Sequence, residues 1–302
     1  MKRKKTAIVL LLISLNSPVL GIQEKIIKDD LGFTFRLNSP PQRIISLTPN
    51  ITEILFALGL GEKVVGVTRF CDFPEEALKK EKIGGMVDPN LEKIKALNPD
   101  LIIGFRGNPL RTLERLRALH LPLYVLEMGT NIESLFSIIQ KVGMVSHNEQ
   151  KAEALIQSLR ERYDRVLSSL REVKHEPKVF LSLHGVGFWT CGKESFLHDL
   201  IQKARGVNIA GRISRKWLNF NREQLIHENP EAIIVLSKSE EDFLKTRDWI
   251  KSEAHLKGIQ AVASDRIYFL DENLATRPGP RLVDALEELA RLLHPQCFER
   301  ER

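Results

Sequence analysis

One short pattern occurs twice in this chain. Residues 90–103 begin Asn-Leu-Glu-Lys-Ile and continue to Asn-Pro-Asp-Leu-Ile-Ile, and residues 221–234 begin Asn-Arg-Glu-Gln-Leu and continue to Asn-Pro-Glu-Ala-Ile-Ile. Each copy has an Asn that can cap a helix, a Glu in the first helical turn, apolar residues at helical spacing and then a β-branched run. Solenoid repeats recur with a period of about 20–50 residues. The distance of 131 residues between Asn90 and Asn221 therefore predicts two similar lobes, each with helices and buried strands.

The order of segments within each lobe predicts a parallel sheet with helices on its faces. In the first lobe we expect an N-terminal hairpin within residues 25–43, strands at residues 43–47, 64–67, 101–105 and 123–126, and helices from about residues 50, 91 and 110. In the second lobe we expect strands at residues 179–183, 232–236 and 266–270, and helices at residues 195–204 and 280–293. Strands that alternate with helices in this way are typical of the α/β class.

Two pairs of residues have the spacing of a helix capping box. Asn50 with Glu53 would begin the helix after the first strand, and Ser146 with Glu149 would begin a long charged helix that reaches about Val173. An apolar stripe supports this second helix, and its length of about 40 Å would let it run along both lobes. A helical linker is stiff, so we expect only small hinge motion between the lobes.

The first residues predict an export signal. Four basic residues at positions 2–5 precede an apolar segment at residues 6–15 and small or neutral residues up to Gly21. The apolar segment is shorter than the ~20 residues of a membrane span, although an uncleaved anchor is the alternative. No Cys precedes Cys71, so the lipid-anchored form is not encoded. We therefore expect a soluble periplasmic protein with a signal peptide at residues 1–21, a first lobe at 22–145, a connecting helix at 146–174 and a second lobe at 175–302.

Charge and cysteine content narrow the function classes. Without the four basic residues of the leader, the formal net charge falls from +6 to +2, and no clustered basic module indicates a nucleic-acid partner. Three cysteines permit at most one disulfide. Cys71 and Cys191 each lie beside an aromatic residue on what we expect to be opposite cleft walls. They could approach each other or a ligand, or both could be unpaired and partly buried thiols.

Aromatic side chains gather where the predicted strands end. Ligands of parallel α/β sheets meet the loops at the carboxyl ends of the strands. The residues at these places are Arg69, Phe70, Cys71, Phe73, Phe105, Arg106, His184, Phe188, Trp189, Asp271, Arg277 and Arg281, with Trp217 in the loop before the second repeated helix. Aromatic residues make up only 7% of the chain, yet both lobes place them here. Rings facing a cleft between two lobes favour a large, flat, partly apolar ligand.

Seven short segments carry a resemblance to a known family. They are residues 44–53, 65–74, 90–92 and 98–102 in the first lobe, and residues 190–195, 222–224 and 277–281 in the second. Through them, nearly the whole mature chain resembles the class III periplasmic binding proteins of ABC importers, and within that family the cobalamin-binding branch. The resemblance implies two α/β lobes joined by one long α-helix, a role in solute capture and no catalysis.

The resemblance also implies a ligand site between the lobes. The residues that match the family's corrin-contacting rings and its cleft arginine are Phe70, Phe105, Trp189, Trp217 and Arg277. Two positions depart from the family pattern. Met86 stands near the place of a tryptophan, and Asn273 stands four residues before Arg277 in place of an acid, with Asp271 close by. A Met preserves apolar contact with a ligand but not ring stacking.

The repeated Glu fits a second property of the family. Its members dock on a dimeric inner-membrane permease through one acidic residue on each lobe tip, and Glu92 and Glu223 match these residues. A carboxylate in the first helical turn also interacts favourably with the helix dipole, which is the simpler explanation for a single Glu. Equivalent positions in two lobes are what a partner with two-fold symmetry requires. We expect a monomer that captures a corrinoid and delivers it to such a permease.

Other ligands and functions are weighed against this interpretation. Within the family, haem and ferric siderophores are the main rivals, because His184 could ligate a haem iron and the arginines at positions 69, 106, 277 and 281 could hold anionic groups. An exported enzyme is a distant alternative, since no nucleophile, phosphate-loop or metalloprotease motif is present. The eight His are scattered, so we expect no resident metal and no cofactor.

Overall fold

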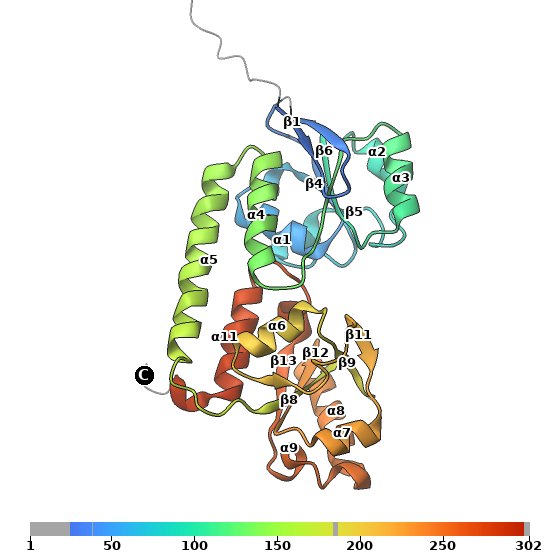
Figure 1. Ribbon diagram of the computed structural model, residues 1–302. Coiled ribbons are helices and arrows are strands. Elements are labelled where there is room, and N and C mark those ends of the chain that lie inside the picture. Colours follow the sequence, from blue (N-terminus) through green and yellow to red (C-terminus); the bar gives the residue numbers. More distant parts are fainter. Residues whose placement is uncertain (1–24, 38, 184–186, 299–302) are drawn as a thin grey trace, which may run out of the picture.

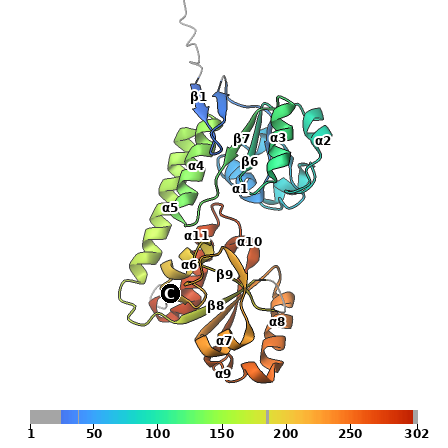
Figure 2. The same cartoon turned by 45° about the vertical axis from the view of Figure 1, so that its right-hand side comes forward.

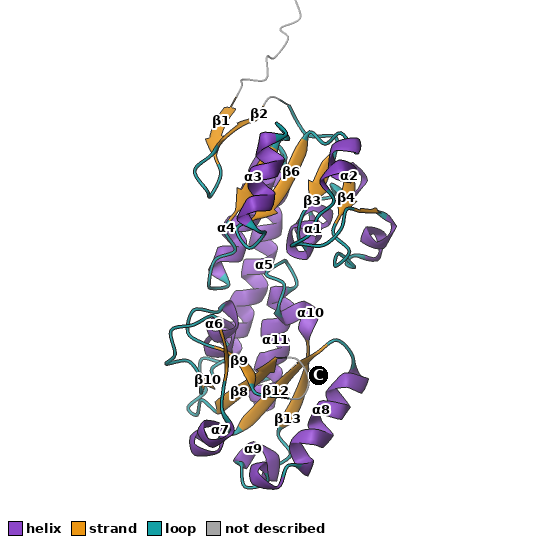
Figure 3. Cartoon of the chain, turned by 90° about the vertical axis from the view of Figure 1, so that its right-hand side faces the viewer, coloured by secondary structure: helices purple, strands orange, loops and turns teal. Residues whose placement is uncertain are grey.

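The computed structural model describes residues 25–37, 39–183 and 187–298 (Figure 1). Two α/β lobes lie one above the other in this view, and α5, Glu149–Ser169, runs along one side of both. Each lobe has a parallel sheet flanked by helices, as Figure 3 shows from the side. The predicted fold class is therefore confirmed. The signal peptide expected at residues 1–21 lies outside the described residues.

The first lobe contains a five-stranded sheet in the order β5-β4-β3-β6-β7, and all of its neighbouring strands are parallel. Its strands are β3 (Ile44–Ser46), β4 (Val64–Val67), β5 (Glu81–Lys82), β6 (Leu101–Phe105) and β7 (Leu123–Leu126). Its helices are α1 (Pro49–Ala57), α2 (Leu91–Ala96), α3 (Leu110–Ala118) and α4 (Glu133–Val145). The expected N-terminal hairpin forms from β1 (Lys25–Lys28) and β2 (Thr34–Leu37). The four predicted strands are confirmed, whereas β5 and α4 were not predicted.

The second lobe contains a four-stranded parallel sheet in the order β10-β8-β12-β13. Its strands are β8 (Lys178–Leu183), β10 (Val207–Asn208), β12 (Ala232–Ser237) and β13 (Ile267–Asp271). Its helices are α6 (Phe196–Lys203), α7 (Arg222–Glu228), α8 (Glu240–Ser252), α9 (Gln260–Ala263), α10 (Glu272–Ala275) and α11 (Leu282–Leu293). A separate antiparallel ribbon pairs β9 (Trp189–Cys191) with β11 (Trp217–Asn219). Trp217, expected in a loop, is therefore in a strand.

The two copies of the repeated pattern fold alike. The Asn90 side chain accepts a hydrogen bond from the backbone N–H of Lys93 at 2.9 Å, and Asn221 accepts one from Gln224 at 2.7 Å. The predicted N-caps are thus confirmed. Each helix is followed by an Asn with a left-handed backbone, with φ of 43° at position 98 and 47° at position 229. Asn tolerates this conformation better than most residues, so the same residue type ends both helices for the same reason.

The two expected capping boxes do not form. Ser146 ends α4 rather than starting α5, and its hydroxyl donates to the carbonyl of Val142 at 2.6 Å. Because α4 already occupies this segment, α5 begins later, with Asn148 in the N-cap position. Its 21 residues span about 31 Å, so the connecting helix is shorter than expected at both ends.

The helix after β3 begins differently from the prediction. It starts at Pro49, a residue suited to the first helical position, and Asn50 lies inside it. Glu53 therefore has no role in capping this helix. Its carboxylate instead binds Arg281 of the second lobe.

A continuous apolar core joins the lobes. One cluster of buried side chains includes Ile44 and Leu101 of the first sheet, Leu159 of α5, and Val179 and Leu286 of the second lobe. Helix α5 packs against α4 on one side and α11 on the other, and Figure 2 shows α4 and α5 side by side. Two smaller clusters cover the other faces of the two sheets. Among the described residues, no helix has both the length and the apolarity needed to cross a membrane.

Candidate functional site

A cavity of about 220 Å³ lies between the two lobes. Every strand of the first sheet contributes to its lining from its carboxyl end, and the second lobe contributes the segments after β12 and β13. The lining residues are Pro49 and Asn50 after β3, Phe70 after β4, Met86 after β5, Phe105 at the end of β6, Met128 after β7, Lys238 after β12, and residues 272, 273 and 276–278 after β13. This is the edge at which parallel α/β sheets bind ligands.

The structure brings together four of the seven predicted ligand-binding residues. Phe70, Met86, Phe105 and Arg277 all line this cavity. Trp189 and Trp217 do not line it; they are 52% and 41% exposed on the β9–β11 ribbon. His184 lies outside the described residues.

Two thioether side chains face the same cavity. Met86 was predicted, but Met128 was not, although it follows a strand that the sequence identified. Polar neighbours hold both methionines: the Asn50 amide approaches the Met128 sulfur at 3.4 Å, and the Asn108 amide donates to the Met86 carbonyl at 2.8 Å. The cavity therefore combines rings and polarisable sulfur on its first-lobe wall.

The β9–β11 ribbon presents the two tryptophans. Trp217 pairs with Cys191, and Asn219 pairs with Trp189, so the two indole rings are diagonal neighbours on one face of the ribbon. The Phe196 ring packs edge-on against Trp217, with ring centroids 6.4 Å apart. In Figure 1 this ribbon lies on the side of the second lobe that faces the first. The exposed rings are thus available for contact with a ligand that extends beyond the enclosed cavity.

Each of the four arginines considered for anion binding already has a carboxylate partner. The pairs are Arg69 with Asp88 at 3.0 Å, Arg106 with Glu127 at 2.8 Å, Arg281 with Glu53 at 2.6 Å, and Arg277 with Asp72. The first two pairs lie within the first lobe, and the last two join the lobes. The positive charge at this face is therefore compensated by the protein itself.

The two inter-lobe pairs differ in burial. The Arg281 guanidinium donates to both oxygens of Glu53, at 3.0 and 2.6 Å, and burial raises the pKa of that carboxyl. Arg277 donates to both oxygens of Asp72, one of them at 3.0 Å, and the hydrogen bond from Arg277 is the main cause that lowers the pKa of Asp72. Asn273, the departure from the family's acid, accepts a further hydrogen bond from Arg277 at 2.6 Å.

The cysteines do not take part in the site. Cys71 and Cys191 are free thiols, each buried in the core of its own lobe, and neither lines the cavity. The Cys71 sulfur lies 3.1 Å from the Thr52 hydroxyl, and burial raises the pKa of Cys191 to about 12. Of the two possibilities left open by the sequence, the structure therefore has unpaired thiols, and they are fully buried.

Glu92 and Glu223 lie on α2 and α7, in separate lobes. Both side chains are exposed in the first turn of their helices, and neither forms an ion pair with another described residue. Neither lines the cavity between the lobes. Their predicted role in docking stays a prediction.

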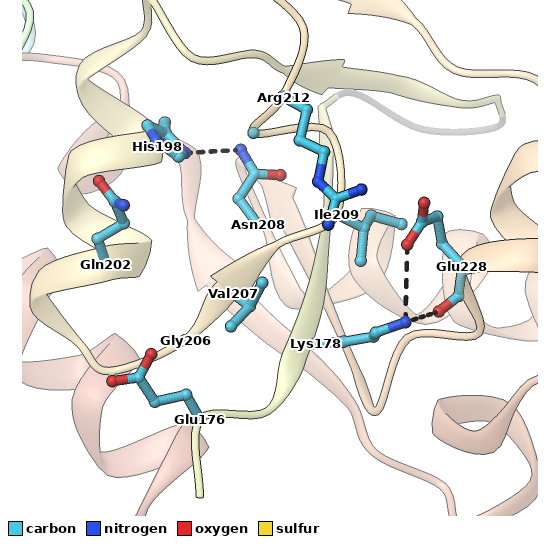
Figure 4. A pocket seen from close by; sticks show the side chains of 11 residues that line it. Glu176, Lys178, His198, Gln202, Gly206, Val207, Asn208, Ile209, Arg212 and Glu228 are labelled. Carbon is cyan, nitrogen blue, oxygen red and sulfur yellow. Dashed lines mark hydrogen bonds and ion pairs between the residues drawn. The ribbon is translucent and has the colours of Figure 1, made fainter.

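The described residues hold no metal-binding cluster, and a further cavity lies near the second sheet. No group of three or more His, Cys, Asp or Glu side chains gathers there in a way that could hold a metal ion. A cavity of about 450 Å³ lies within the second lobe beside β10 (Figure 4). Two pairs of its polar groups contact one another: Lys178 donates to the Glu228 carbonyl at 3.0 Å, and His198 lies 3.3 Å from the Asn208 amide. None of the predicted site residues lines it.

Comparisons with known proteins agree with this architecture. A family model described as periplasmic binding protein matches residues 44–274. A vitamin B12-binding protein of Vibrio cholerae is 31% identical over 265 residues, which cover 84% of this chain and 90% of that protein. An uncharacterised ABC transporter substrate-binding lipoprotein of Bacillus subtilis is 29% identical, over 87% of this chain and 83% of its own.

Solved structures give the same result. The periplasmic vitamin B12-binding protein BtuF of Vibrio cholerae superposes with a TM-score of 0.74 at 28% identity, covering 86% of this chain and 99% of that one. The periplasmic haem-binding protein RhuT of Roseiflexus sp. RS-1 superposes with a TM-score of 0.77, also at 28% identity, covering 85% and 99%. The chain therefore belongs to the periplasmic binding protein family, as a class III binding protein of the ABC importers.

Proposed function

We propose that this protein is the periplasmic solute-binding component of an ABC importer, which captures a corrinoid between its lobes and delivers it to a membrane permease. The observation that carries the proposal is the inter-lobe cavity, where Phe70, Phe105, Met86 and Met128 provide an apolar wall. Relatives named for vitamin B12 binding, at 27–31% identity, support the choice of ligand. The same relatives are binding proteins, which supports a role in capture rather than catalysis.

The size of the cavity indicates how such a ligand would sit. Ligand pockets usually enclose about 300–1,000 Å³, and the enclosed space here is about 220 Å³. A corrinoid would therefore occupy the cavity with only part of its surface. The rest would extend along the cleft, where the exposed rings of Trp189 and Trp217 offer further contact.

Haem is the second candidate, and two observations favour it. A haem-binding protein is as similar in sequence as the B12-binding structure. In addition, Met86 and Met128 line the cavity, and a thioether can serve as an axial ligand of haem iron. The compensated arginines weigh against ligands with several anionic groups, such as haem and anionic siderophores, because each propionate or catecholate would have to displace a separate protein carboxylate.

Purified mature protein should be titrated with cyanocobalamin, haemin and a ferric siderophore, followed by visible spectroscopy and calorimetry. We expect saturable binding of one molecule of cyanocobalamin per chain and weaker binding of the other two. Tighter binding of haemin, with the spectrum of a six-coordinate iron, would replace the corrinoid by haem. If none of the three binds, the proposed ligand class is wrong.

A further inference from the structure

Two arginines four residues apart in the sequence connect the second lobe to the first. Arg277 and Arg281 lie on the segment between α10 and α11, and each binds a different carboxylate of the first lobe. Asp72 and Glu53, their partners, come from separate parts of that lobe. The two ion pairs look alike in sequence but differ in their surroundings.

The pair of Arg281 with Glu53 is fixed. The side chains are only 17% and 2% exposed, and two hydrogen bonds join them. The Arg281 guanidinium also lies over the Phe73 ring, 3.8 Å from its centroid. A carboxylate so deeply buried cannot leave Arg281 without losing both of its hydrogen bonds to a charged partner. This pair is therefore a buried link between the two lobes.

The pair of Arg277 with Asp72 can open at much lower cost. Arg277 is 14% exposed and lines the inter-lobe cavity, whereas Asp72 is 47% exposed and does not line it. Once released, Asp72 would be solvated by water. Arg277 would keep the hydrogen bond to Asn273 and the carboxylate of Glu53, 3.7 Å away. The next residue, Phe73, stays anchored under Arg281, so only the Asp72 side chain has to turn away.

We propose that, in the ligand-free protein, the Asp72 carboxylate binds the Arg277 guanidinium at the place where an anionic group of the ligand binds. This group displaces Asp72 when the ligand enters the cleft. The proposal rests on the proposed function and specifies the chemistry of one part of the site: Arg277 binds a phosphodiester or a carboxylate at the edge of the ligand. Asp72 then acts as an internal competitor. It lowers the affinity for ligands that carry such a group and leaves the affinity for ligands without one unchanged.

Two corrinoids and one variant test this directly. Cyanocobalamin carries a phosphodiester in its nucleotide loop, and dicyanocobinamide lacks both the loop and the phosphate. Calorimetric titration of the Asp72→Asn protein should show cyanocobalamin bound about three- to tenfold more tightly than by the unchanged protein. Dicyanocobinamide should bind equally to both proteins. Haemin, which has two propionates, should follow cyanocobalamin if it binds.

Further variants assign the effect to Arg277. In Asp72→Asn/Arg277→Gln the gain should disappear, because the anion receptor is gone. Glu127→Gln is a matched control, since it removes a carboxylate from another arginine, Arg106, at the same edge of the first sheet. It should leave both affinities unchanged. Asp72→Asn/Lys238→Gln tests the other cation that lines the cavity, and this double variant should keep the gain.

The outcomes separate this proposal from the proposed function. If both corrinoids bind and Asp72→Asn changes neither affinity, or weakens both, the corrinoid function stands and the exchange at Arg277 is wrong. If the gain in cyanocobalamin affinity disappears in Asp72→Asn/Lys238→Gln, the anion receptor is Lys238 and the proposal is likewise overturned. If neither corrinoid binds, the proposed ligand is wrong. The exchange at Arg277 is then tested by comparing the haemin affinities of the unchanged and Asp72→Asn proteins. Binding of none of the three overturns both.

Discussion

At the scale of single residues, the cleft combines apolar contact surface with charges that are already paired. Phe70, Phe105, Met86 and Met128 provide surface for a large ring system, and the neighbouring arginines are held by carboxylates. An arginine that is already held in place needs no reorganisation to donate to the carbonyl of a ligand amide nearby, but each anion must displace a protein carboxylate. This arrangement favours a ligand with a broad apolar face and few charges.

Truncation of the exposed rings should weaken binding. We expect Trp189→Ala and Trp217→Ala each to reduce corrinoid affinity by roughly 1–3 kcal/mol, because aromatic anchors often dominate the energy of an interface. Calorimetric titration of the two variants measures this. Trp249→Ala is the control, since that ring packs against Phe188 in the second lobe and does not line the inter-lobe cavity. Unchanged affinity in the Trp189/Trp217 double variant, with an intact fold, would place the ligand elsewhere.

The buried inter-lobe pair should contribute to stability. Glu53→Gln removes the negative charge opposite Arg281. The positive charge of that largely buried arginine is then no longer balanced by a carboxylate at hydrogen-bond distance. We expect a loss of about 3–5 kcal/mol in the free energy of unfolding, the usual cost of breaking a buried pair. The exposed pair of Arg106 with Glu127 gives the comparison, and Glu127→Gln should cost at most about 1 kcal/mol. Urea unfolding of both variants, followed by circular dichroism, tests the difference; equal losses would contradict it.

The thiols should differ in reactivity. Burial raises the pKa of Cys71 and raises that of Cys191 to about 12, so both stay protonated at pH 8 and out of reach of reagents. Cys297 is only partly buried. We expect a thiol reagent to modify one cysteine of the native protein quickly and all three after denaturation, which mass spectrometry can assign by position. Rapid native labelling of Cys191 would show that the second lobe opens locally.

At the scale of elements, helix α5 decides how the lobes can move. It packs against α4 of the first lobe and α11 of the second, and Arg162 on α5 binds Asp284 and Glu287 of α11 at 2.6 and 2.7 Å. A core cluster is continuous through it. A helix held on both sides cannot bend without breaking these contacts, whereas hinges that move far are usually short loop segments.

Ligand binding should therefore change the overall shape little. We expect the lobes of the free and ligand-bound protein to differ in orientation by no more than a few degrees. Small-angle scattering profiles of the two forms should therefore be nearly identical. Gln157 is exposed in the middle of α5, so Gln157→Pro should break the helix at a cost of about 3 kcal/mol and increase the motion. Gln157→Ala should behave like the unchanged protein. A large compaction of the unchanged protein on binding would show that α5 is not the constraint.

The sequence predicted the elements that depend on local patterns. Strands such as β4, β6 and β7 have the expected bounds because short apolar runs identify them. The capping boxes at Asn50 and Ser146 were wrong because a Pro and a preceding helix took those positions. The ribbon of β9 and β11 was missed, since Trp-Thr-Cys and Trp-Leu-Asn contain no apolar run that would indicate a buried strand.

At the scale of the whole molecule, the site depends on contacts that no local pattern encodes. The sequence indicated Arg277 as a cleft residue, but its hydrogen bond to Asp72 joins positions 205 residues apart, and that of Arg281 to Glu53 joins positions 228 apart. Met128 was missed for the related reason that only the folded sheet brings its strand end beside Phe105. The duplication was visible in sequence because both lobes reuse the same caps and the same left-handed Asn.

The repeated carboxylates Glu92 and Glu223 should affect transport without affecting capture. They are exposed on α2 and α7, on separate lobes and away from α5 in Figure 1, and neither lines the cavity. We expect Glu92→Lys and Glu223→Lys to leave ligand affinity unchanged. Each should weaken the complex with the permease, because a reversed charge at an interface replaces attraction by repulsion. The loss should be largest at low salt, where exposed charges are least screened.

Reconstituted transport and a pull-down on the cognate permease would measure both single variants and the double variant. Glu149→Lys is the control, since Glu149 is also an exposed carboxylate in the first turn of a helix but has no counterpart in the repeat. It should transport normally. If the double reversal also transports normally, the repeated Glu serves only to stabilise the start of two related helices. A loss in the double variant alone would mean that either lobe suffices for docking, which a partner with two-fold symmetry allows.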